Sequence, residues 1–385
     1  MHHGVEEGRA AMRWSRPMKA IAVKPGSSQV MLVDHPEPMI SATTHVKLKI
    51  IEVGVCGTDK EICLFEYGTP PDGSDYLVIG HESLAEVIEV GSGVTRVKMG
   101  DLAVLMVRRP CADPTCAACR HGRQDFCFSG TFTERGIGKA HGYMTEMVVE
   151  HEQFVFVLPK ELRKVGVLVE PLTIAEKALI QVWDVQERLP WAAPGGERGR
   201  GAGHKAVVLG AGPVGLLGAM ALVVRGFDTW VYSLEPKTDA KALLVEEFGG
   251  HYVSALDTKM EDLSEVIGNI DLVYEATGAA GPAFKLMEEL GTNGVFILTG
   301  VPGKRGPVPI QTDVLMRNLV LRNQILYGTV NAGPDAFAAA VSDLTEFMKR
   351  WPAVVPKLIS QRYAPERFEE LLLGKPTGIK NVIAF

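Results

Sequence analysis

The chain has 385 residues, 46% of them hydrophobic and 22% charged, and its formal net charge is −6. This length is enough to bury a substantial core and favours two domains. The weakly acidic balance, with a pI near 6.0, excludes nucleic acid and anionic membrane surfaces as partners, because neither would attract such a surface. We expect a soluble enzyme or binding protein.

The N-terminal segment MHHGVEEGRAAMRWSRP carries no apolar stretch of the kind that a secretory signal needs. We interpret it as a polar tail before a first strand near Met18, and we expect a cytoplasmic protein with reduced thiols. The uncharged run at 206–224, AVVLGAGPVGLLGAMALVV, is long enough to resemble a membrane span. Its central glycines and proline instead favour a strand, a tight turn and a buried helix.

Strand-like runs dominate the chain as far as Val157. They are KAIAVK, VKLKIIEV, LAEVIEVG and DLAVLMV, each rich in β-branched residues and bounded by Gly, Pro or Asp. A helix is predicted within 165–185, and the Gly-, Pro- and charge-rich stretch at 190–205 is interpreted as a surface connection. The first half is therefore expected to be a strand-rich, antiparallel unit.

From Lys205 onward strands and helices alternate. The strand-like runs are KAVVLG, TWVYS, DLVYEAT and GVFILTG, and the helical segments between them begin at Pro213, span 240–248 and surround Leu286. Such alternation predicts βαβ units on a parallel sheet.

The last part of the chain, from about Asn331, holds an Ala-rich amphipathic helix and a final strand, KNVIAF, that would pair back onto the first half. The predicted fold class is therefore α/β in two domains. A β-rich domain is expected at 18–189 and 331–385, and a doubly wound parallel-sheet domain at 190–330.

The hexapeptide GAGPVG, which begins at Gly210, follows an apolar strand and opens an apolar helix. This is the context in which a G-x-G-x-x-G pattern binds a dinucleotide. Gly210 permits the tight turn, Gly212 lets the pyrophosphate approach the backbone, and Gly215 lets helix and strand pack closely. The N-terminus of the helix, at Pro213 and Val214, brings amide donors and a positive dipole. The motif alone is weak, but at the head of a βαβ series it predicts a nicotinamide dinucleotide site.

The end of the second strand of this series, YSLEPK, bears on the choice between NAD and NADP. Ser233 and Glu235 are the candidates to meet the adenosine ribose, and the segment has no arginine to pair with a 2′-phosphate. A carboxylate accepts hydrogen bonds from ribose hydroxyls and repels a phosphate, so NAD is slightly favoured. Lys237 keeps NADP open, and a solvated charged loop is the alternative interpretation.

Four cysteines lie close together in the stretch CADPTCAACRHGRQDFC. Four thiolates in one loop close a tetrahedral shell around zinc and leave no position for water or substrate, which describes a structural site. Disulfides are the alternative, and a reducing compartment disfavours them. The four residues are Cys111, Cys116, Cys119 and Cys127.

Any metal chemistry then needs a second, open site. Its candidates are Cys56 in GVCGTDKE, His81 and Glu82 in IGHES, and Glu170 in LVEPLT. Thiolate, imidazole and carboxylate together hold zinc and leave one position free. Taken singly, Cys56 also fits a buried small hydrophobe and Glu170 a helix cap or surface charge.

These motifs in this order resemble the zinc-dependent medium-chain dehydrogenases: CGTD, then GHE, a four-cysteine lobe, and EPL before a GxGxxG domain. The segments MVRRPC, FTERGIGKAHGYMTE, LVEPLTIAEKAL, YEATG and YGTVNAGPDAF are similar to those of archaeal-type glucose (aldose) 1-dehydrogenases. The resemblance runs from Met18 to Phe385. It implies a GroES-like catalytic domain and a Rossmann domain, two zinc ions per chain, a nicotinamide cofactor, and a homodimer or homotetramer.

The resemblance also implies roles at matching positions. Cys56 and His81 match catalytic zinc ligands, and Glu170 stands where polyol and glucose enzymes place a carboxylate or amide. A carboxylate at Glu170 would also bind substrate by accepting a hydrogen bond from a neighbouring sugar hydroxyl. Glu82 matches a carboxylate that coordinates the zinc or exchanges with water. The remaining matches are Thr58 as the hydroxyl that relays the substrate proton, Asp59 as the carboxylate that orients the histidine, Glu134 and Asn331 as residues that bind sugar hydroxyls, and Thr277 and Asn331 as cofactor contacts.

Some positions depart from the family pattern. Ala85 replaces a common glycine, and Val107 replaces an asparagine that contacts sugar in some members. Leu234 and Glu235 stand where NADP-dependent members place arginines, so that cofactor preference is not carried over. The first cysteine spacing is also longer than usual.

The sequence thus predicts oxidation of the anomeric hydroxyl of an aldose such as D-glucose to the aldonolactone, with the C1 hydride passing to NAD or NADP. A polyol or secondary-alcohol dehydrogenase would share the zinc residues. A non-catalytic zinc- and nucleotide-binding protein is a more distant alternative. Cys63 is expected to be a packed core thiol.

Overall fold

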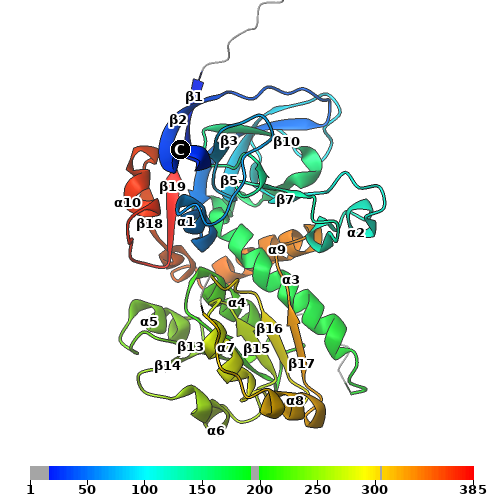
Figure 1. Ribbon diagram of the computed structural model, residues 1–385, viewed down its shortest axis with the longest axis vertical. Helices are drawn as coiled ribbons and strands as arrows, with labels where there is room; N and C mark the ends of the chain where they lie inside the picture. The colour runs from blue at the N-terminus through cyan, green and yellow to red at the C-terminus, as the bar shows by residue number, and fades with distance from the viewer. Residues whose placement is uncertain (1–16, 192–198, 304–305) are drawn as a thin grey trace, which may run out of the picture.

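The computed structural model describes residues 17–191, 199–303 and 306–385. The predicted polar tail before Pro17 and residues 192–198 of the predicted connection lie outside the described residues. Figure 1 shows a strand-rich half above and a parallel sheet flanked by helices below, with two long helices, α3 and α9, where the halves meet.

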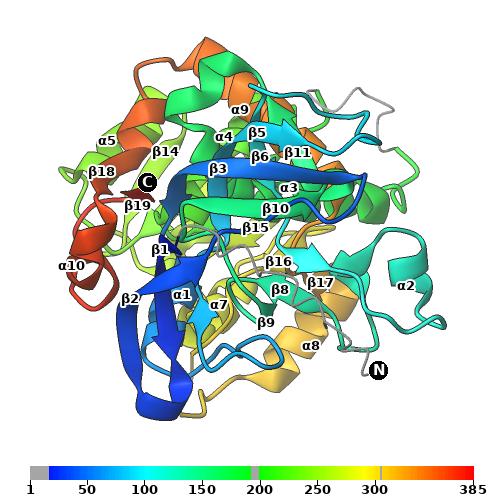
Figure 2. The same ribbon diagram turned by 90° about the horizontal axis from the view of Figure 1, so that it is seen from above.

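The strand-rich half is built on a seven-stranded sheet in the order β11-β6-β5-β3-β19-β18, with β10 also paired to β3. Figure 2 shows these strands crossing the top of the molecule. Neighbouring strands of this seven-stranded sheet are antiparallel, except β18 and β19, which are parallel. The strands are β3 (His45–Gly54), β5 (Glu82–Val90), β6 (Leu102–Leu105), β10 (Met147–His151), β11 (Val155–Leu158), β18 (Ile359–Tyr363) and β19 (Lys380–Ala384).

Two three-stranded sheets and three short helices complete this half. The sheets have the orders β2-β1-β4 and β7-β8-β9. Their strands are β1 (Pro17–Lys24), β2 (Gln29–Pro36), β4 (Leu77–Val78), β7 (Arg108–Arg109), β8 (Thr133–Arg135) and β9 (Lys139–Ala140), and the helices are α1 (Gly57–Cys63), α2 (Ala117–Arg120) and α10 (Phe368–Leu372). The four predicted strand runs of the first half all fall on strands.

The chain's last strand lies inside the main sheet of the first half. β19 pairs antiparallel with β3, with Val382 opposite Gly54, and parallel with β18. Its consecutive residues Val382 and Ile383, which point to opposite faces, are both fully buried, because the strand is covered on both faces. The predicted return of KNVIAF to the first half is therefore confirmed.

The lower half is a six-stranded, all-parallel sheet in the order β14-β13-β12-β15-β16-β17. This is the strand order of doubly wound dinucleotide-binding folds. The strands are β12 (Lys205–Leu209), β13 (Asp228–Ser233), β14 (His251–Ser254), β15 (Leu272–Glu275), β16 (Val295–Leu298) and β17 (Ile325–Gly328). The helices are α4 (Pro213–Val224), α5 (Ala240–Glu247), α6 (Leu263–Ile267), α7 (Ala280–Met287) and α8 (Thr312–Leu321).

The uncharged run at 206–224 divides into β12, a turn and α4, as its glycines predict. Among the described residues, no helix has the length and apolar character needed to cross a membrane.

Helices α3 (Val169–Gln186) and α9 (Pro334–Arg350) join the two halves. One buried apolar cluster contains Leu84 of β5, Leu172 of α3, Leu217 of α4 and Phe337 of α9. The same core therefore supports both the upper sheet and the dinucleotide fold, and it fixes their relative position.

Candidate active site

The start of α1 holds two of the expected metal-site residues in place. The Asp59 carboxylate accepts a hydrogen bond from the Cys56 N–H (2.9 Å), as in a capping box. Its other oxygen faces Nδ1 of His81 at 3.4 Å, and both side chains are buried. Because Nδ1 faces Asp59, Nε2 is left for a metal. Thr58, which lies between Cys56 and Asp59 in the sequence, is half-buried.

Cys56, His81 and Glu82 come together as a candidate metal site, with one ligand atom from each lying within 4.8 Å of the others. Glu170, in the first turn of α3, is buried next to this group but does not belong to it by distance. The structure therefore brings three of the four predicted ligands together, and coordination by Glu170 stays a prediction.

Several ionisable groups lie close together at this site. Burial raises the pKa of the Glu170 carboxyl to about 7, with His81 opposing the rise and Glu82 adding to it. Burial lowers the pKa of His81, but Asp59 and then Cys56 hold it well above the usual value. Three carboxyl groups thus share a buried space, and a divalent cation would relieve their repulsion. The donor types present, thiolate, imidazole and carboxylate, are those that zinc accepts.

Lys380, the first residue of β19, supplies a cation from the far end of the chain. Its Nζ donates to both carboxylate oxygens of Glu82 (2.7 and 2.6 Å) and to the carbonyl of Val55 (3.2 Å). Lys380 and Glu82 are 2% and 1% exposed, so the pair is removed from water. Gly54 makes room for it, because a Cβ there would lie 2.0 Å from Glu82 Oε2. Lys380 therefore sets where Glu82 points relative to Cys56 and His81, the other two members of this metal-ligand group.

The four-cysteine lobe has the geometry of a closed metal site. One sulfur from each of the four cysteines lies within 4.8 Å of the others, and none forms a disulfide. Cys116 Sγ and Cys127 Sγ are 3.8 Å apart, about the edge of a tetrahedron with Zn–S bonds of about 2.3 Å. Burial raises the pKa of Cys127, but the Ser129 hydroxyl and the Gly130 N–H bring it down to about 6. The lobe therefore favours a thiolate at Cys127, whereas burial raises the pKa of Cys119 to about 12. The four are Cys111, Cys116, Cys119 and Cys127.

The predicted glycine turn joins β12 to α4. Gly210 has φ +106°, a conformation that favours glycine. A Cβ on Gly215 would lie 2.1 Å from the Gly210 carbonyl, so helix and strand pack as closely as predicted. A Cβ on Gly212 would meet nothing within 4 Å, so space lies above the turn and the N-terminus of α4, which starts at Pro213 and Val214. Thr277 adjoins this turn, since its methyl would lie 2.5 Å from a Cβ on Gly210.

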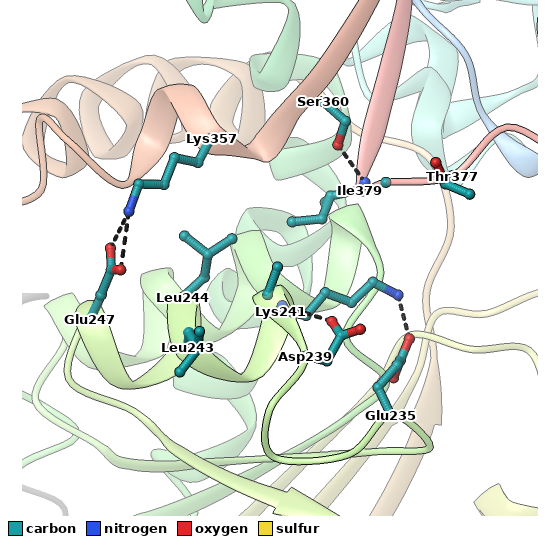
Figure 3. Close-up of a pocket in the computed structure, with 12 residues that line it drawn as sticks. Glu235, Asp239, Lys241, Leu243, Leu244, Glu247, Lys357, Ser360, Thr377 and Ile379 are labelled. Atoms are coloured by element: carbon teal, nitrogen blue, oxygen red, sulfur yellow. Dashed lines mark hydrogen bonds and ion pairs between the residues drawn. The ribbon is translucent and has the colours of Figure 1, made fainter.

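The end of β13 carries the two predicted ribose contacts. Ser233 donates to Glu235 (2.5 Å), and Lys241 of α5 forms an ion pair with the same carboxylate. Together these contacts lower the pKa of Glu235 against the effect of burial. Figure 3 shows Glu235 and Lys241 at one end of a cleft of about 610 Å³ between α5 and the segment around β18 and β19. Lys357 pairs with Glu247 across it.

Glu134 of β8 and Asn331, in the loop after β17, contact each other, and their binding of sugar hydroxyls stays a prediction. Asn331 Nδ2 donates to Glu134 Oε1 (3.0 Å), and Arg108 holds the same oxygen (3.0 Å). Within the described residues, Glu134 Oε2 accepts no hydrogen bond. Burial and then Glu134 raise the pKa of Tyr67, which also senses the charge of His81. The charges of Glu134 and His81 therefore both act on Tyr67.

Two site features escaped sequence reasoning. One is Lys380, whose partner lies 298 residues away. The other is Glu275 at the end of β15, whose buried carboxylate accepts from the backbone N–H groups of Thr277, Gly278 and Gly300. A charged residue ending an otherwise apolar strand was the only local signal. Cys63 is buried in the core as expected.

Comparison with known proteins agrees with this geometry. Residues 163–385 match the family described as glucose dehydrogenase C-terminus, and residues 42–160 match the alcohol dehydrogenase GroES-like domain. Glucose 1-dehydrogenases of Methanocella arvoryzae and Thermoproteus tenax are 37% and 38% identical over 369 and 371 residues, covering 95% of this chain and 99% of each relative. The structure of Haloferax mediterranei glucose dehydrogenase in complex with NADP, Zn and gluconolactone has a TM-score of 0.83 at 31% identity, covering 96% of this chain and 99% of that chain. The chain belongs to the glucose dehydrogenase family of the zinc-dependent medium-chain dehydrogenases.

Proposed function

We propose that this protein oxidises the anomeric hydroxyl of an aldose such as D-glucose to the aldonolactone with a nicotinamide dinucleotide as hydride acceptor. The observation that carries the proposal is the buried group of zinc-type donors, with one ligand atom each from Cys56, His81 and Glu82 lying within 4.8 Å of the others. The relatives named above are glucose 1-dehydrogenases, and one was solved with NADP, Zn and gluconolactone.

Each residue then has a defined task. Cys56, His81, Glu82 and Glu170 would hold a catalytic zinc, and Asp59 orients the imidazole of His81. When bound, zinc supplies Lewis acidity that lowers the pKa of a hydroxyl, and the nicotinamide ring accepts a hydride.

Three further residues would act on the sugar itself. Thr58 takes the proton from the anomeric hydroxyl and passes it toward solvent. Glu134 Oε2 and the Asn331 amide bind sugar hydroxyls and so orient C1 toward the cofactor. Burial of Glu134 strengthens this selection, because a ligand without the matching hydroxyl would leave the carboxylate unpaired.

Initial rates test the proposal. The panel contains glucose, galactose, xylose, sorbitol and simple alcohols, each with NAD and with NADP. Turnover of at least one aldose with formation of lactone is expected. Oxidation of sorbitol or simple alcohols without any aldose would overturn the proposal in favour of a polyol or secondary-alcohol dehydrogenase, and no oxidation of any substrate would favour a non-catalytic protein.

For the cofactor, we propose a slight preference for NAD. The support is Glu235, a carboxylate held at the end of β13 by Ser233 and Lys241, where it would accept from ribose hydroxyls and repel a 2′-phosphate. The cleft beside Glu235 is suited to the adenosine end of the dinucleotide. The ratio of kcat/KM for NAD to that for NADP measures the preference.

We propose two zinc ions per chain, one held by the open site and one by the four-cysteine lobe, whose sulfur separation supports the second. Metal analysis of the purified protein should find two.

The division into a catalytic domain at 18–189 and 331–385 and a Rossmann domain at 190–330 is proposed on the strand pairing. The free thiols support the cytoplasm as the location.

A homodimer or homotetramer is also proposed. β17 is an edge strand of the parallel sheet, and the neighbouring α8 exposes Met316, Val320 and Leu321. An unpaired edge beside apolar side chains favours pairing with a second copy. Sedimentation velocity would show the assembly, and a monomer at micromolar concentration would contradict it.

A further inference from the structure

Asp125 links the four-cysteine lobe to the rest of the molecule. It lies in the turn Gln124–Phe126, which ends just before Cys127, and it is 4% exposed. Its carboxylate accepts from Arg123 Nε and Nη2 (3.1 and 3.0 Å) within the lobe and from Lys177 Nζ (3.1 Å) on α3. Its carbonyl oxygen accepts from Lys177 Nζ (3.3 Å) and from Arg108 Nη1 (3.4 Å). These contacts are more than a surface loop needs to hold its own shape.

Lys177 carries one of these contacts to the loop after β17. The side chain is 3% exposed, and its ammonium also donates to the carbonyl of Val330 (2.8 Å). Val330 precedes Asn331, whose φ is +60°. A non-glycine residue in that conformation is held there by its surroundings, although asparagine tolerates it better than most. Lys177 therefore fixes the backbone at the point where Asn331 must turn toward Glu134.

Arg108 connects the Asp125 carbonyl to the Glu134 carboxylate. Its Nη1 meets the Asp125 carbonyl, while its Nε and Nη2 hold Glu134 Oε1 (3.1 and 3.0 Å). Asn331 Nδ2 donates to that same oxygen. Two chains of contacts thus start at Asp125 and meet at Glu134 Oε1, one through Lys177 and Asn331 and the other through Arg108.

We propose that Asp125 and Lys177 are positioning residues that hold the sugar-binding pair, Glu134 and Asn331, in a fixed relation to the four-cysteine lobe. This inference rests on the proposed function, in which that pair binds sugar hydroxyls. The lobe then contributes to substrate binding without touching the substrate, because it anchors the carbonyl and carboxylate that orient Arg108 and Lys177. Such buried charged groups are costly to leave unpaired, which keeps the arrangement rigid.

The central test is Lys177→Met, which shortens the unbranched side chain by one atom and removes all three donors. We expect KM for glucose to rise about tenfold, as loss of a hydrogen bond to a charged group gives, with a smaller effect on kcat. KM for the nicotinamide cofactor and zinc per chain should stay as in the wild type. Affinity for gluconolactone, measured by calorimetry, should fall by the same factor. Asp125→Asn keeps an acceptor oxygen, so its KM for glucose should lie between those of the wild type and Lys177→Met.

Glu176→Gln is the matched control. Glu176 is the neighbouring residue on α3, is fully buried, and pairs with Arg225 on the side of the dinucleotide fold (2.6 Å). Its replacement should leave KM for glucose unchanged. If Lys177→Met also leaves KM for glucose unchanged, the positioning role is refuted. Should Lys177→Met not fold, Lys177→Gln, which retains a donor for Val330, takes its place.

Non-additivity separates this inference from the proposed function. Asn331→Ala should raise KM for glucose, and Lys177→Met added to it should have little further effect, because both act through the same side chain. Fully additive effects of the two changes would contradict the route through Asn331. If Asn331→Ala and Glu134→Gln leave KM for every aldose unchanged, the proposed function of the pair fails instead.

Discussion

Replacing Lys380 by Met tests how the buried cation and the metal-ligand group depend on each other. In the wild type the Lys380 ammonium neutralises the Glu82 carboxylate inside the protein, where both are almost fully buried. Without it and without zinc, the carboxylate has to take up a proton, since a bare buried charge costs more. For a glutamate with a reference pKa of about 4.3, protonation at pH 7 costs about 3.7 kcal/mol. The zinc-free variant should be less stable than zinc-free wild type by about this amount.

The loss should shrink in acid and in the presence of zinc. The folded variant keeps a proton that the unfolded chain releases above pH 4.3, so the destabilisation grows as pH rises, and at pH 5 it should be only about 1 kcal/mol. A bound zinc ion takes over neutralisation of the carboxylate. By the thermodynamic cycle, the variant should therefore bind the catalytic zinc more tightly at pH 7, by up to about 500-fold if the compensation is complete.

The assays are denaturant unfolding of zinc-free protein at pH 5 and pH 7, and competition with a chromophoric chelator for the zinc whose release abolishes activity. Lys380→Arg keeps the charge and serves as one control. Lys47→Met is the other, because it breaks an ion pair with Glu37 elsewhere on the same sheet and should leave zinc affinity unchanged. Weaker zinc binding in Lys380→Met, or unchanged stability without zinc, would refute the reasoning.

Four other predictions concern the remaining parts of the site. Cys127→Ser should reduce zinc from two ions per chain to one and lower thermal stability more than it lowers kcat of the surviving folded enzyme; two retained zinc ions would show that the lobe is not a metal site. Glu170→Cys should lower glucose turnover, because a thiolate accepts a weaker hydrogen bond from the sugar than a carboxylate does, and unchanged kcat/KM for glucose would count against a role for the carboxylate. Leu234→Arg combined with Glu235→Arg should raise kcat/KM for NADP relative to NAD by at least tenfold, since one guanidinium–phosphate pair is worth about 1.4 kcal/mol or more; an unchanged ratio would exclude this segment as the selector. The pKa of Glu176 is raised to about 8, mainly by burial, so the folded state binds a proton that the unfolded chain releases above about pH 4.5. Stability should therefore fall as pH rises from about 5 to 8, and Glu176→Gln should flatten that slope in equilibrium unfolding.

Sequence was enough for those parts of the site whose residues lie close together in the chain. GAGPVG specifies a turn because Gly210 and Gly215 are required by local geometry. The four cysteines could be expected to meet as a candidate metal lobe because a single loop supplies all of them. The parallel sheet follows from the alternation of strands and helices. These features could be predicted from short windows.

Contacts between distant segments could not be predicted from the residues alone. Lys380 meets Glu82 across 298 positions, and nothing in KNVIAF distinguishes a buried lysine from an exposed one at the start of a strand. Asp125 and Lys177 look like ordinary surface charges until the fold places α3 against the lobe. The distance of Glu170 from the other ligands likewise depends on how α3 is set against the upper sheet.

The position of β19 affects the order in which the protein can mature during synthesis. The ribosome makes the metal-ligand residues early and β19 last, after the whole dinucleotide fold has emerged. Until β19 inserts between β3 and β18, Glu82 has no lysine partner and the edge of β3 has no neighbour there. A nascent chain in which Cys56, His81 and Glu82 have already met therefore holds a site without its lysine. Capture of metal by that site before release from the ribosome would compete with insertion of the C-terminal strand.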